Sequence, residues 1–495
     1  MGAFMRDTDA FTWYMERDPV LRSTVVAVAW LAPSPDWDAL VARVERATRL
    51  LPSLRQRVLE PPARLSTPLW TVDDRFDLSW HLRRMDAPHP QTPETVVAFA
   101  RNAAMTAFDR SYPLWEFTLV EHLKGERAAL VMKLHHSLTD GLGAMQLAPL
   151  LFDTEPTPNA PSDEVEVPAG ERLGTGELIR ASLVRDWERA VGIVRFGAGS
   201  LPRVLRSARH PLTSLSEVVE TGRSIARTVA PVRDTLSPIM KERSLGRHLE
   251  MLEVRLEDLA RAATVAGGSI NDAFMAGATG GLRRYHDRHE FPVEKLRVTM
   301  PISIRRPDDP SGGNRITLMR FAVPISDPDP AARIREIGRL CRGARSERSL
   351  PLTNAIAGPL NLMPPGVIGS MLKHVDFLAS DVPGLEIPVY LAGARVERYS
   401  AFGPTTGSSV NLTLVSYDAA CCVGITIDTA AVPDPDVLVE CFREGFEEVL
   451  HLAGDHDGVR LPLHDDARAE TARSPRSPRS PESEEYEVNE PPWND

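Results

Sequence analysis

The sequence predicts a mixed α/β protein made of two large units, and three observations lead to that prediction. The chain has 495 residues, which is the length of two large domains or about three ordinary ones. Hydrophobic residues make up 42% and charged residues 25%, the usual balance of a globular protein with a sizeable core. Strand-like and helix-like segments alternate through residues 1–152, and they do so again through residues 251–465.

Apolar spacing defines the elements of the first unit, residues 1–152. Residues 38–50 carry apolar side chains at helical spacing, and Pro52 ends that pattern. Residues 128–134 form a short apolar run of good strand formers, and residues 142–152 again show helical spacing. The first unit is therefore expected to pack helices on a sheet.

A polar crossover of residues 153–250 follows the first unit. It begins with a Pro-, Asp- and Glu-rich stretch and continues as an amphipathic helical pattern over residues 178–209. Two interpretations of its basic side chains stay open: a solvated face that packs on the body, or a helix attracted to an anionic membrane surface. The basic residues are Arg189, Arg195, Arg203, Arg206 and Arg209.

The second unit, residues 251–465, shows the same mixture of patterns. Its expected elements are a helix over 271–285, a strand over 296–300, a hairpin of 411–417 with 421–428, and a helix over 435–452. Residues 466–495 are rich in Pro, Ser and Glu, so this tail is expected to be disordered.

Charge and cysteine usage limit the compartment and the partners. The formal net charge of −11 argues against a nucleic-acid partner. Four cysteines without metal or disulfide spacing fit the reducing cytoplasm, and the N-terminus lacks the apolar core of a signal peptide. Residues 349–372 are uncharged and long enough to span a bilayer, but their four prolines and two asparagines argue against a continuous helix.

The segment with the clearest chemistry is VMKLHHSLTDGLGAMQ, residues 131–146. It places His135 and His136 at the end of an expected strand, with Asp140 and Gly141 before an expected helix. A histidine held by a tight turn suits general base catalysis near neutral pH. Asp140 could instead cap the helix, His135 could be a core residue, and the three could bind a metal. No further cluster of metal-ligating residues supports the metal, so none is expected.

The motif HHxxxDG resembles that of the CoA-dependent acyltransferase superfamily. Further segments follow in an order that resembles the bacterial wax ester synthase/diacylglycerol acyltransferase family over about residues 6–455. Asp381 departs from the asparagine usual in that family, and Asp418-Ala419 replaces its usual Asp-Gly turn. The matching segments are Pro113-Leu114-Trp115, Asn271-Asp272, the block with Ser303 and Arg305, Gly313-Asn314, residues 380–384, and residues 411–418.

The resemblance implies a fold, a reaction and a location. The fold would consist of two related chloramphenicol-acetyltransferase-like halves around a central channel, joined by the helical crossover. The reaction would transfer a long-chain acyl group from acyl-CoA, as a substrate, to diacylglycerol or a long-chain alcohol, without a cofactor. Because both substrates are lipidic, a cytoplasmic protein at a membrane surface or lipid inclusion is expected.

The resemblance also implies roles for single residues. His136 would be the general base, and Asp140 would support the site by pairing with Arg305. His135 would either shape the site or pack in the core, and Asn271 would either donate to the developing oxyanion or cap its helix. Gly141 would let the backbone approach the substrate. The expected substrate-binding residues are Pro113, Leu114, Trp115, Asp272, Ser303 and Asn314.

Two other functions remain open at the level of sequence. One is a condensation-type acyltransferase that takes its acyl group from a carrier protein. The absence of an attached carrier module in the sequence argues against it. The other is a non-catalytic protein that binds lipid inclusions, which the presence of both His136 and Asp140 argues against.

Overall fold

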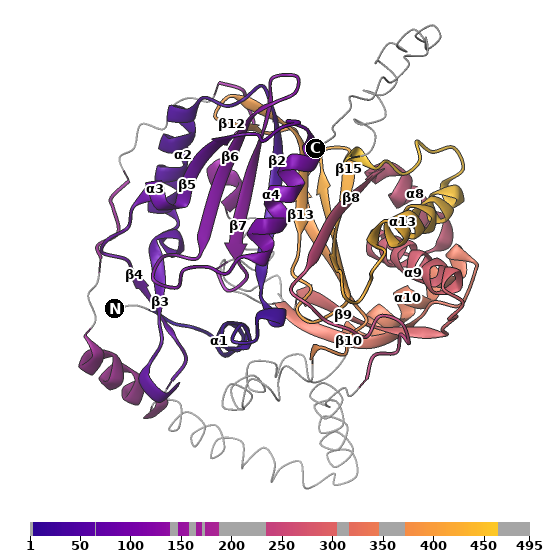
Figure 1. The fold of residues 1–495 in the computed structure, drawn as a ribbon, viewed down its shortest axis with the longest axis horizontal. Helices are drawn as coiled ribbons and strands as arrows, with labels where there is room; N and C mark the ends of the chain where they lie inside the picture. Colours follow the sequence, from indigo (N-terminus) through magenta and orange to yellow (C-terminus); the bar gives the residue numbers. More distant parts are fainter. Residues whose placement is uncertain are drawn as a thin grey trace, which may run out of the picture.

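Two six-stranded β-sheets lie side by side in the computed structural model of the chain (Figure 1). Helices cover the outer face of each sheet, and a smaller three-stranded sheet lies near the N-terminus. The described residues are 3–64, 66–138, 147–157, 165–170, 174–187, 234–303, 316–345 and 372–463.

The first sheet has the strand order β12-β13-β2-β7-β6-β5. All neighbouring strands are antiparallel except β5 and β6. The strands β2 and β7 are buried along almost their whole length, which explains their near-continuous apolar sequences. The bounds are β2 (Thr24–Ala32), β5 (Leu82–Asp86), β6 (Trp115–Leu123), β7 (Arg127–His135), β12 (Tyr390–Leu391) and β13 (Ala394–Phe402).

Two long helices pack on opposite faces of the first sheet. The helix α2 (Trp37–Leu50) begins at Asp36, whose carboxylate accepts a hydrogen bond from Ala39 N, and buries Leu40, Val44 and Ala47. The helix α4 (Pro93–Met105) packs its buried residues on the other face, where side chains of both large sheets share one hydrophobic cluster. The short helix α3 (Leu78–His81) lies beside β5.

The second sheet has the strand order β10-β9-β11-β14-β15-β8. Its outer face is covered by α8 (Leu256–Ala266), α9 (Ile270–Arg288), α10 (Pro330–Arg345) and α13 (Pro435–Leu450), which form the largest hydrophobic cluster (Figure 1). The strands are β8 (Arg247–Arg255), β9 (Lys295–Ser303), β10 (Ile316–Pro324), β11 (Phe377–Leu385), β14 (Val410–Tyr417) and β15 (Ala420–Asp428).

The small sheet places the N-terminal segment below the first sheet. It pairs β1 (Ala3–Phe4) with β4 (Leu69–Val72) and β3 (Gln56–Leu59). The helix α1 (Asp7–Met15) and a 3-10 turn (Pro19–Leu21) then lead directly into β2. This path brings α1 close to the ends of β2 and β7.

The strands β12 and β13 come from the second predicted unit but belong to the first sheet. The strand β13 pairs antiparallel with β2 from Phe402↔Val26 to Arg395↔Ala32. It also contacts the second sheet, because Arg398 Nε donates to Glu253 Oε2 of β8 at 2.7 Å. The two halves are therefore joined through a shared strand, in addition to the expected crossover.

The local sequence patterns agree with the elements that form. The patterns at 38–50, 128–134, 271–285 and 435–452 correspond to α2, β7, α9 and α13, and the expected hairpin is β14 with β15. The mixed α/β class is confirmed. The helix expected over 178–209 is described only over residues 175–187, and the basic residues Arg189 to Arg209 and the tail lie outside the described residues.

Among the described residues, none of the helices has the length and apolar character needed to cross a bilayer. Of the uncharged segment 349–372, only its last residue is described.

The close contact between the two sheets depends on a glycine of β15. A Cβ on Gly424 would overlap the carbonyl oxygen of Ala401 in β13. We therefore expect Gly424→Ala to destabilise the protein by about 1–3 kcal/mol, the usual effect of an added methyl group in a packed core. The measurement is the denaturation midpoint in urea.

Gly343→Ala is the matched control for this substitution. Gly343 lies in α10, where an added Cβ meets nothing within 4 Å, so helix propensity should leave the midpoint equal or higher. If both variants unfold at the wild-type midpoint, the two sheets do not need the close contact at Gly424.

Candidate functional site

The histidine motif begins at the end of β7, the strand that lies between β2 and β6. His135 N donates to Leu114 O at 3.0 Å, and His136 N donates to Ser23 O at 2.9 Å. Leu138 N then donates back to His135 O at 2.9 Å, which forms a turn over residues 136–138. Backbone hydrogen bonds alone therefore fix the main chain of both histidines.

The His135 side chain is buried in a pocket made by the N-terminal segment. Its Nδ1 accepts from Ser137 N at 3.1 Å and lies 2.7 Å from Ser137 Oγ. Its Nε2 lies 3.1 Å from Glu16 Oε2, although the angle is poor for a hydrogen bond and the contact is mainly electrostatic. Trp13 and Phe108 meet the ring edge-on, with centroids at 5.7 and 6.0 Å.

Glu16 connects both histidines to the end of α1. Its Oε1 accepts from Ser23 N at 2.6 Å, and Ser23 is the residue whose carbonyl binds His136 N. Burial raises the pKa of Glu16, but His135, the Ser23 N–H and Arg110 outweigh burial, so the pKa lies below its ordinary value. Glu16 is therefore a carboxylate at neutral pH and holds the turn electrostatically.

A second buried charge lies on the same face of β7. Lys133 is two residues before His135, so both side chains point to one side of the strand. Its Nζ lies 3.1 Å from Glu116 Oε1 and 4.2 Å from the centre of the Phe108 ring. Burial lowers the pKa of Lys133, against the opposing effect of Glu116.

The segment Pro113-Leu114-Trp115 supports the motif from β6. The Leu114 carbonyl is the backbone partner of His135 N. Trp115 is fully buried, donates from Nε1 to Leu54 O at 2.7 Å, and stacks on His81 at 4.6 Å between ring centroids. These contacts give the segment a packing role, and its predicted role in substrate binding stays a prediction.

Asn271 and Asp272 lie at the start of α9 in the second half. The capping residue is Ser269, which accepts from Asp272 N at 3.3 Å while Asp272 Oδ2 accepts from Ser269 N at 2.9 Å. Asp272 therefore stabilises the helix terminus. Asn271 is not the cap, and its Nδ2 lies 4.0 Å from Cys341 Sγ in α10.

The remaining predicted site residues are only partly described. Ser303 is the last residue of β9, where it pairs with Ile316 of β10. Asp140, Gly141, Arg305 and Asn314 lie outside the described residues. The predicted pairing of Asp140 with Arg305 therefore stays a prediction.

The four cysteines are free and buried, so they are weak nucleophiles. Burial raises the pKa of Cys421 to about 12 and that of Cys341, Cys422 and Cys441 to about 11. At neutral pH all four are thiols, and it is the thiolate that reacts.

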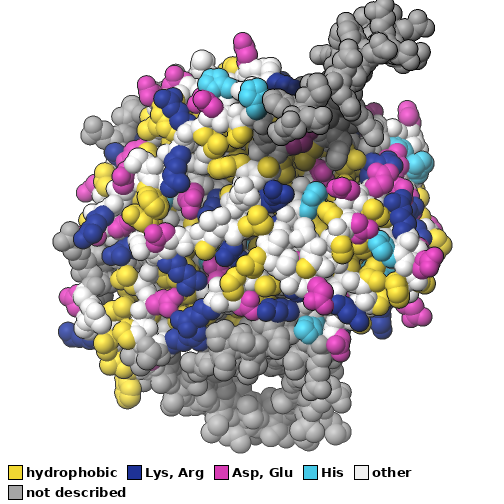
Figure 2. Space-filling model, in the orientation of Figure 1, with side chains coloured by type: hydrophobic (Ala, Val, Ile, Leu, Met, Phe, Trp, Pro, Cys, Tyr) yellow, Lys and Arg dark blue, Asp and Glu magenta, His cyan; other side chains and the backbone are white. Residues whose placement is uncertain are grey.

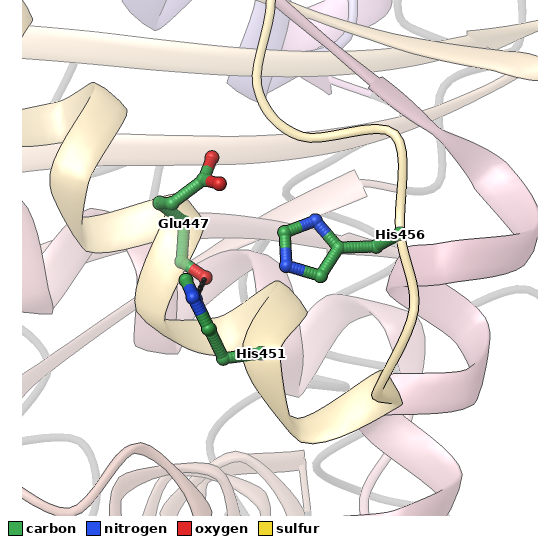
Figure 3. Close-up of side chains that lie close together, drawn as sticks. All are labelled: Glu447, His451 and His456. Atoms are coloured by element: carbon green, nitrogen blue, oxygen red, sulfur yellow. Dashed lines mark hydrogen bonds between the residues drawn. The ribbon is translucent and has the colours of Figure 1, made fainter.

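Three side chains at the end of α13 could approach a cation (Figure 3). The ligand atoms of Glu447, His451 and His456 all lie within 4.8 Å of one another. However, His456 Nδ1 accepts from Gly458 N at 3.1 Å, which puts the proton of a neutral ring on Nε2, and Val459 N donates to Glu447 Oε2 at 3.0 Å. A metal at His456 would have to displace that proton or break the bond from Gly458 N, and the cluster lies in the opposite half from β7 (Figure 1).

The surface gives no sign of a nucleic-acid footprint on the face that Figure 2 shows. Basic and acidic side chains alternate there over the described part of both halves. Nucleic-acid binding normally requires a continuous basic patch.

The sequence alone did not reveal Glu16, Ser23 or Ser137. Ser137 is adjacent to the motif, and its N–H could have been expected to bind a preceding side chain. Glu16 directly follows α1, more than a hundred positions earlier in the chain, so no local pattern indicates its contact with His135.

Comparison with known proteins supports an acyltransferase of one family. The wax ester synthase/diacylglycerol acyltransferase catalytic domain family matches residues 5–274, and the C-terminal domain of the same family matches residues 312–450. A Mycobacterium tuberculosis protein with the provisional name diacylglycerol O-acyltransferase is 33% identical over 458 residues, covering 92% of this chain and 93% of that protein. Another protein of that organism with the same provisional name is 26% identical over 466 residues, covering 90% of each.

Solved structures confirm the fold. The wax ester synthase/diacylglycerol acyltransferase of Marinobacter aquaeolei superposes with a TM-score of 0.61 at 20% identity, covering 92% of this chain and 100% of that one. The first condensation domain of the calcium-dependent antibiotic synthetase gives a TM-score of 0.56 at 15% identity, covering 93% and 99%. With a catalytic-domain match over more than half of its length, the chain belongs to the wax ester synthase/diacylglycerol acyltransferase family.

Proposed function

We propose that this acyltransferase moves a long-chain acyl group from acyl-CoA to the hydroxyl of diacylglycerol or of a long-chain alcohol, with His136 as general base. The observation that carries the proposal is the backbone hydrogen bond of His136 to Ser23, within a turn that Glu16 and His135 hold rigid. A general base needs a fixed position relative to the proton that it removes.

The proposed reaction is one direct transfer. His136 removes the proton from the acceptor hydroxyl, and the oxygen attacks the thioester carbonyl. The carbon–sulfur bond then breaks, and His136 returns the proton to the leaving CoA thiolate. Acyl-CoA acts as a substrate, and the proposed step needs no separate cofactor or metal.

The cysteine environment favours direct attack over an acyl-enzyme intermediate. Each of the four cysteines is a buried thiol with a raised pKa. None has the electropositive, accessible surroundings that activate a catalytic thiolate. The substrate hydroxyl is therefore the nucleophile in this proposal.

An exposed apolar surface supports association with a lipid phase. In the helix of residues 175–187, Leu178 is buried, but Leu183, Val184 and Trp187 are exposed, Trp187 by 72%. Tryptophan and leucine on one side of a surface helix are typical of proteins that lie at a membrane interface. We infer a peripheral position from which a lipidic acceptor reaches the channel.

Replacing the proposed base tests the mechanism directly. We expect His136→Ala to lower the rate of CoA release from palmitoyl-CoA by roughly 10²–10⁴-fold with either dioleoylglycerol or hexadecanol as acceptor. Thiol release and chromatography of the ester product measure the effect, and the ratio between the two acceptors identifies the preferred product.

The matched control is His451→Ala, because His451 is an exposed histidine in the opposite half. This variant should keep wild-type activity. Equal rates for wild type and His136→Ala would exclude His136 as the base. A folded wild-type protein that esterifies neither acceptor would favour a carrier-linked donor or a non-catalytic role.

Replacing Glu16 tests the support of the histidine turn. We expect Glu16→Gln to lower kcat roughly tenfold with little change in KM, because the turn loses its fixed geometry while the substrate contacts remain. The loss of a buried, charged hydrogen-bond acceptor should also lower stability at neutral pH by about 1–3 kcal/mol.

The pH dependence follows from the depressed pKa of Glu16. A carboxylate with a lowered folded-state pKa stabilises the protein above its unfolded pKa, and this contribution is lost as the pH falls through the folded pKa. The stability difference between wild type and Glu16→Gln should therefore shrink below pH about 4. A stability difference that stays constant from neutral to acid pH would contradict the role of Glu16 as a buried carboxylate. A wild-type kcat in the variant would contradict its support of the histidine turn. The control is Glu257→Gln, because Glu257 is exposed.

A further inference from the structure

The helix of residues 175–187 lies outside the two large sheets, at the lower left of Figure 1. Leu178 on its inner face is only 7% exposed. Its outer face is apolar, because Leu183, Val184 and Trp187 lie on one side of the helix and are 54%, 51% and 72% exposed. Figure 2 shows hydrophobic side chains at the same edge of the molecule. A helix of this length is only marginally stable in water by itself, so contacts on both faces decide whether it forms.

Arg185 ties this helix to the segment that leads into α1. Its Nη1 donates to Thr67 Oγ1 at 2.6 Å, and its Nη2 donates to Met5 O at 3.0 Å. Its Cζ lies 4.4 Å from the centre of the Phe4 ring. The guanidinium group therefore holds β1, the residue after β1 and the segment just before β4 together.

Packing continues from Met5 to the histidine turn. The Met5 side chain is 1% exposed and belongs to one buried cluster with Trp13 of α1 and with Leu114. Leu114 O accepts from His135 N, and the Trp13 ring meets the His135 ring edge-on. Glu16, the residue after α1, holds the same turn. Both ends of α1 therefore lie on a continuous path from Arg185 to the histidines.

Asp186 makes a second connection to α1. Its Oδ1 accepts from Ser66 Oγ at 3.3 Å, and the carbonyl of Ser66 accepts from the Tyr14 hydroxyl at 3.3 Å. Tyr14 lies two residues before Glu16. Both connections leave from the last turn of the helix, so they exist only while that turn is folded against the small sheet.

The outer face has the chemistry that suits an anionic lipid surface. The exposed Arg180 lies on the same side of the helix as Leu183, Val184 and Trp187. Residues 188–233, which follow in the sequence, contain eight arginines and only three acidic residues. Tryptophan and leucine beside arginine are typical of helices that lie in a membrane interface. Anionic lipids attract these arginines, whereas a second copy of the chain would repel them.

We propose that contact of this outer face with an anionic lipid surface activates the histidine site, and that Arg185 is the positioning residue that couples the two. The regulated reaction is the proposed function, on which this part rests. Lipid binds the docked helix better than an unfolded segment, because only the helix gathers the apolar side chains on one side. The docked helix then holds Met5 and α1, and Glu16 holds the turn. By linkage, a fixed turn strengthens lipid binding by the same factor.

Hydrogen exchange tests this coupling without any turnover. The amides to follow are Ser23 N–H, which Glu16 accepts, and His136 N–H. We expect vesicles of phosphatidylcholine with phosphatidylglycerol to slow both exchange rates in the wild type by roughly fivefold or more, the usual lower limit of coupling between two sites. In Arg185→Met the vesicles should still bind but should not slow the exchange. Arg185→Lys keeps the charge and a donor, so it should recover part of the response.

Activity with soluble substrates gives the second readout. Hexanoyl-CoA and hexanol dissolve without vesicles, so vesicles cannot act by delivering a substrate. Vesicles should raise the kcat of the wild type by a similar factor with little change in KM, and they should not raise the kcat of Arg185→Met. The matched control is Arg339→Met, since Arg339 is an exposed arginine of α10 in the second half. This control should respond to vesicles as the wild type does.

A separate pair of variants tests the lipid-facing surface. Leu183→Ser/Trp187→Ser should lower the partition coefficient onto the same vesicles by roughly tenfold or more, because two large apolar side chains are lost from the contact. The matched control is Val265→Ser, since Val265 is 67% exposed but lies in α8 of the second half. That variant should partition as the wild type does.

Each remaining result has a definite meaning. Vesicle binding without any change in the exchange of the two amides would overturn the coupling, and a full response in Arg185→Met would overturn the role of Arg185. Equal binding to neutral vesicles would overturn the anionic lipid partner. A dimer that the double serine variant converts to monomers would assign the face to a second copy instead. Slowed exchange in a protein that transfers no acyl group would leave the coupling standing while the proposed reaction fails.

Discussion

The hydrogen bond between His136 N and Ser23 O is the constraint on which the site depends. It fixes the register of β7 between β2 and β6, so that His135 is the last paired residue and His136 the first residue of the turn. A slip of one residue would exchange the faces of the two histidines. His135 would then leave the pocket of Glu16, and the next residue would lose its backbone partner. The N-terminal helix α1 therefore contributes to the site, although no motif lies within it.

The shared strand β13 holds the two halves together, because it contacts both large sheets. It continues the first sheet beyond β2 and packs on β8 and β15 of the second sheet. Gly424 allows this approach, and Trp30 Nε1 and Cys422 Sγ both lie 3.4 Å from Ser400 Oγ at the contact. The loop after β13 carries Pro404 and Thr405 to the wall of a small cavity between the two halves. The same strand thus joins the sheets and leads into part of that cavity wall.

The sequence predicted the helices and hairpins that depend on residues close together in the chain. The helix pattern at 38–50 and the paired strands 411–417 and 421–428 are local, and the structure has them nearly at the expected bounds. The partner of His135 is not local, since Glu16 lies more than a hundred positions earlier in the chain. Nor could spacing show that β13 joins the first sheet. For Trp115, an ordered series of motifs predicted a role but not the packing: its ring stacks on His81 inside the core.

Two groups of buried polar side chains lie near the motif, and they differ in whether they have partners. Behind β7, Lys133 pairs with Glu116, while Glu16 accepts from Ser23 N and lies 3.1 Å from His135 Nε2. At the boundary between the halves, the hydroxyls of Thr24, Thr405 and Thr426 have no hydrogen-bond partner among the described residues. The contacts of the first group hold the end of β7 in place, which suits a base whose position must not change. Ser23 links the two regions, because its N–H and carbonyl hold Glu16 and His136 while its neighbours Arg22 and Thr24 line the cavity.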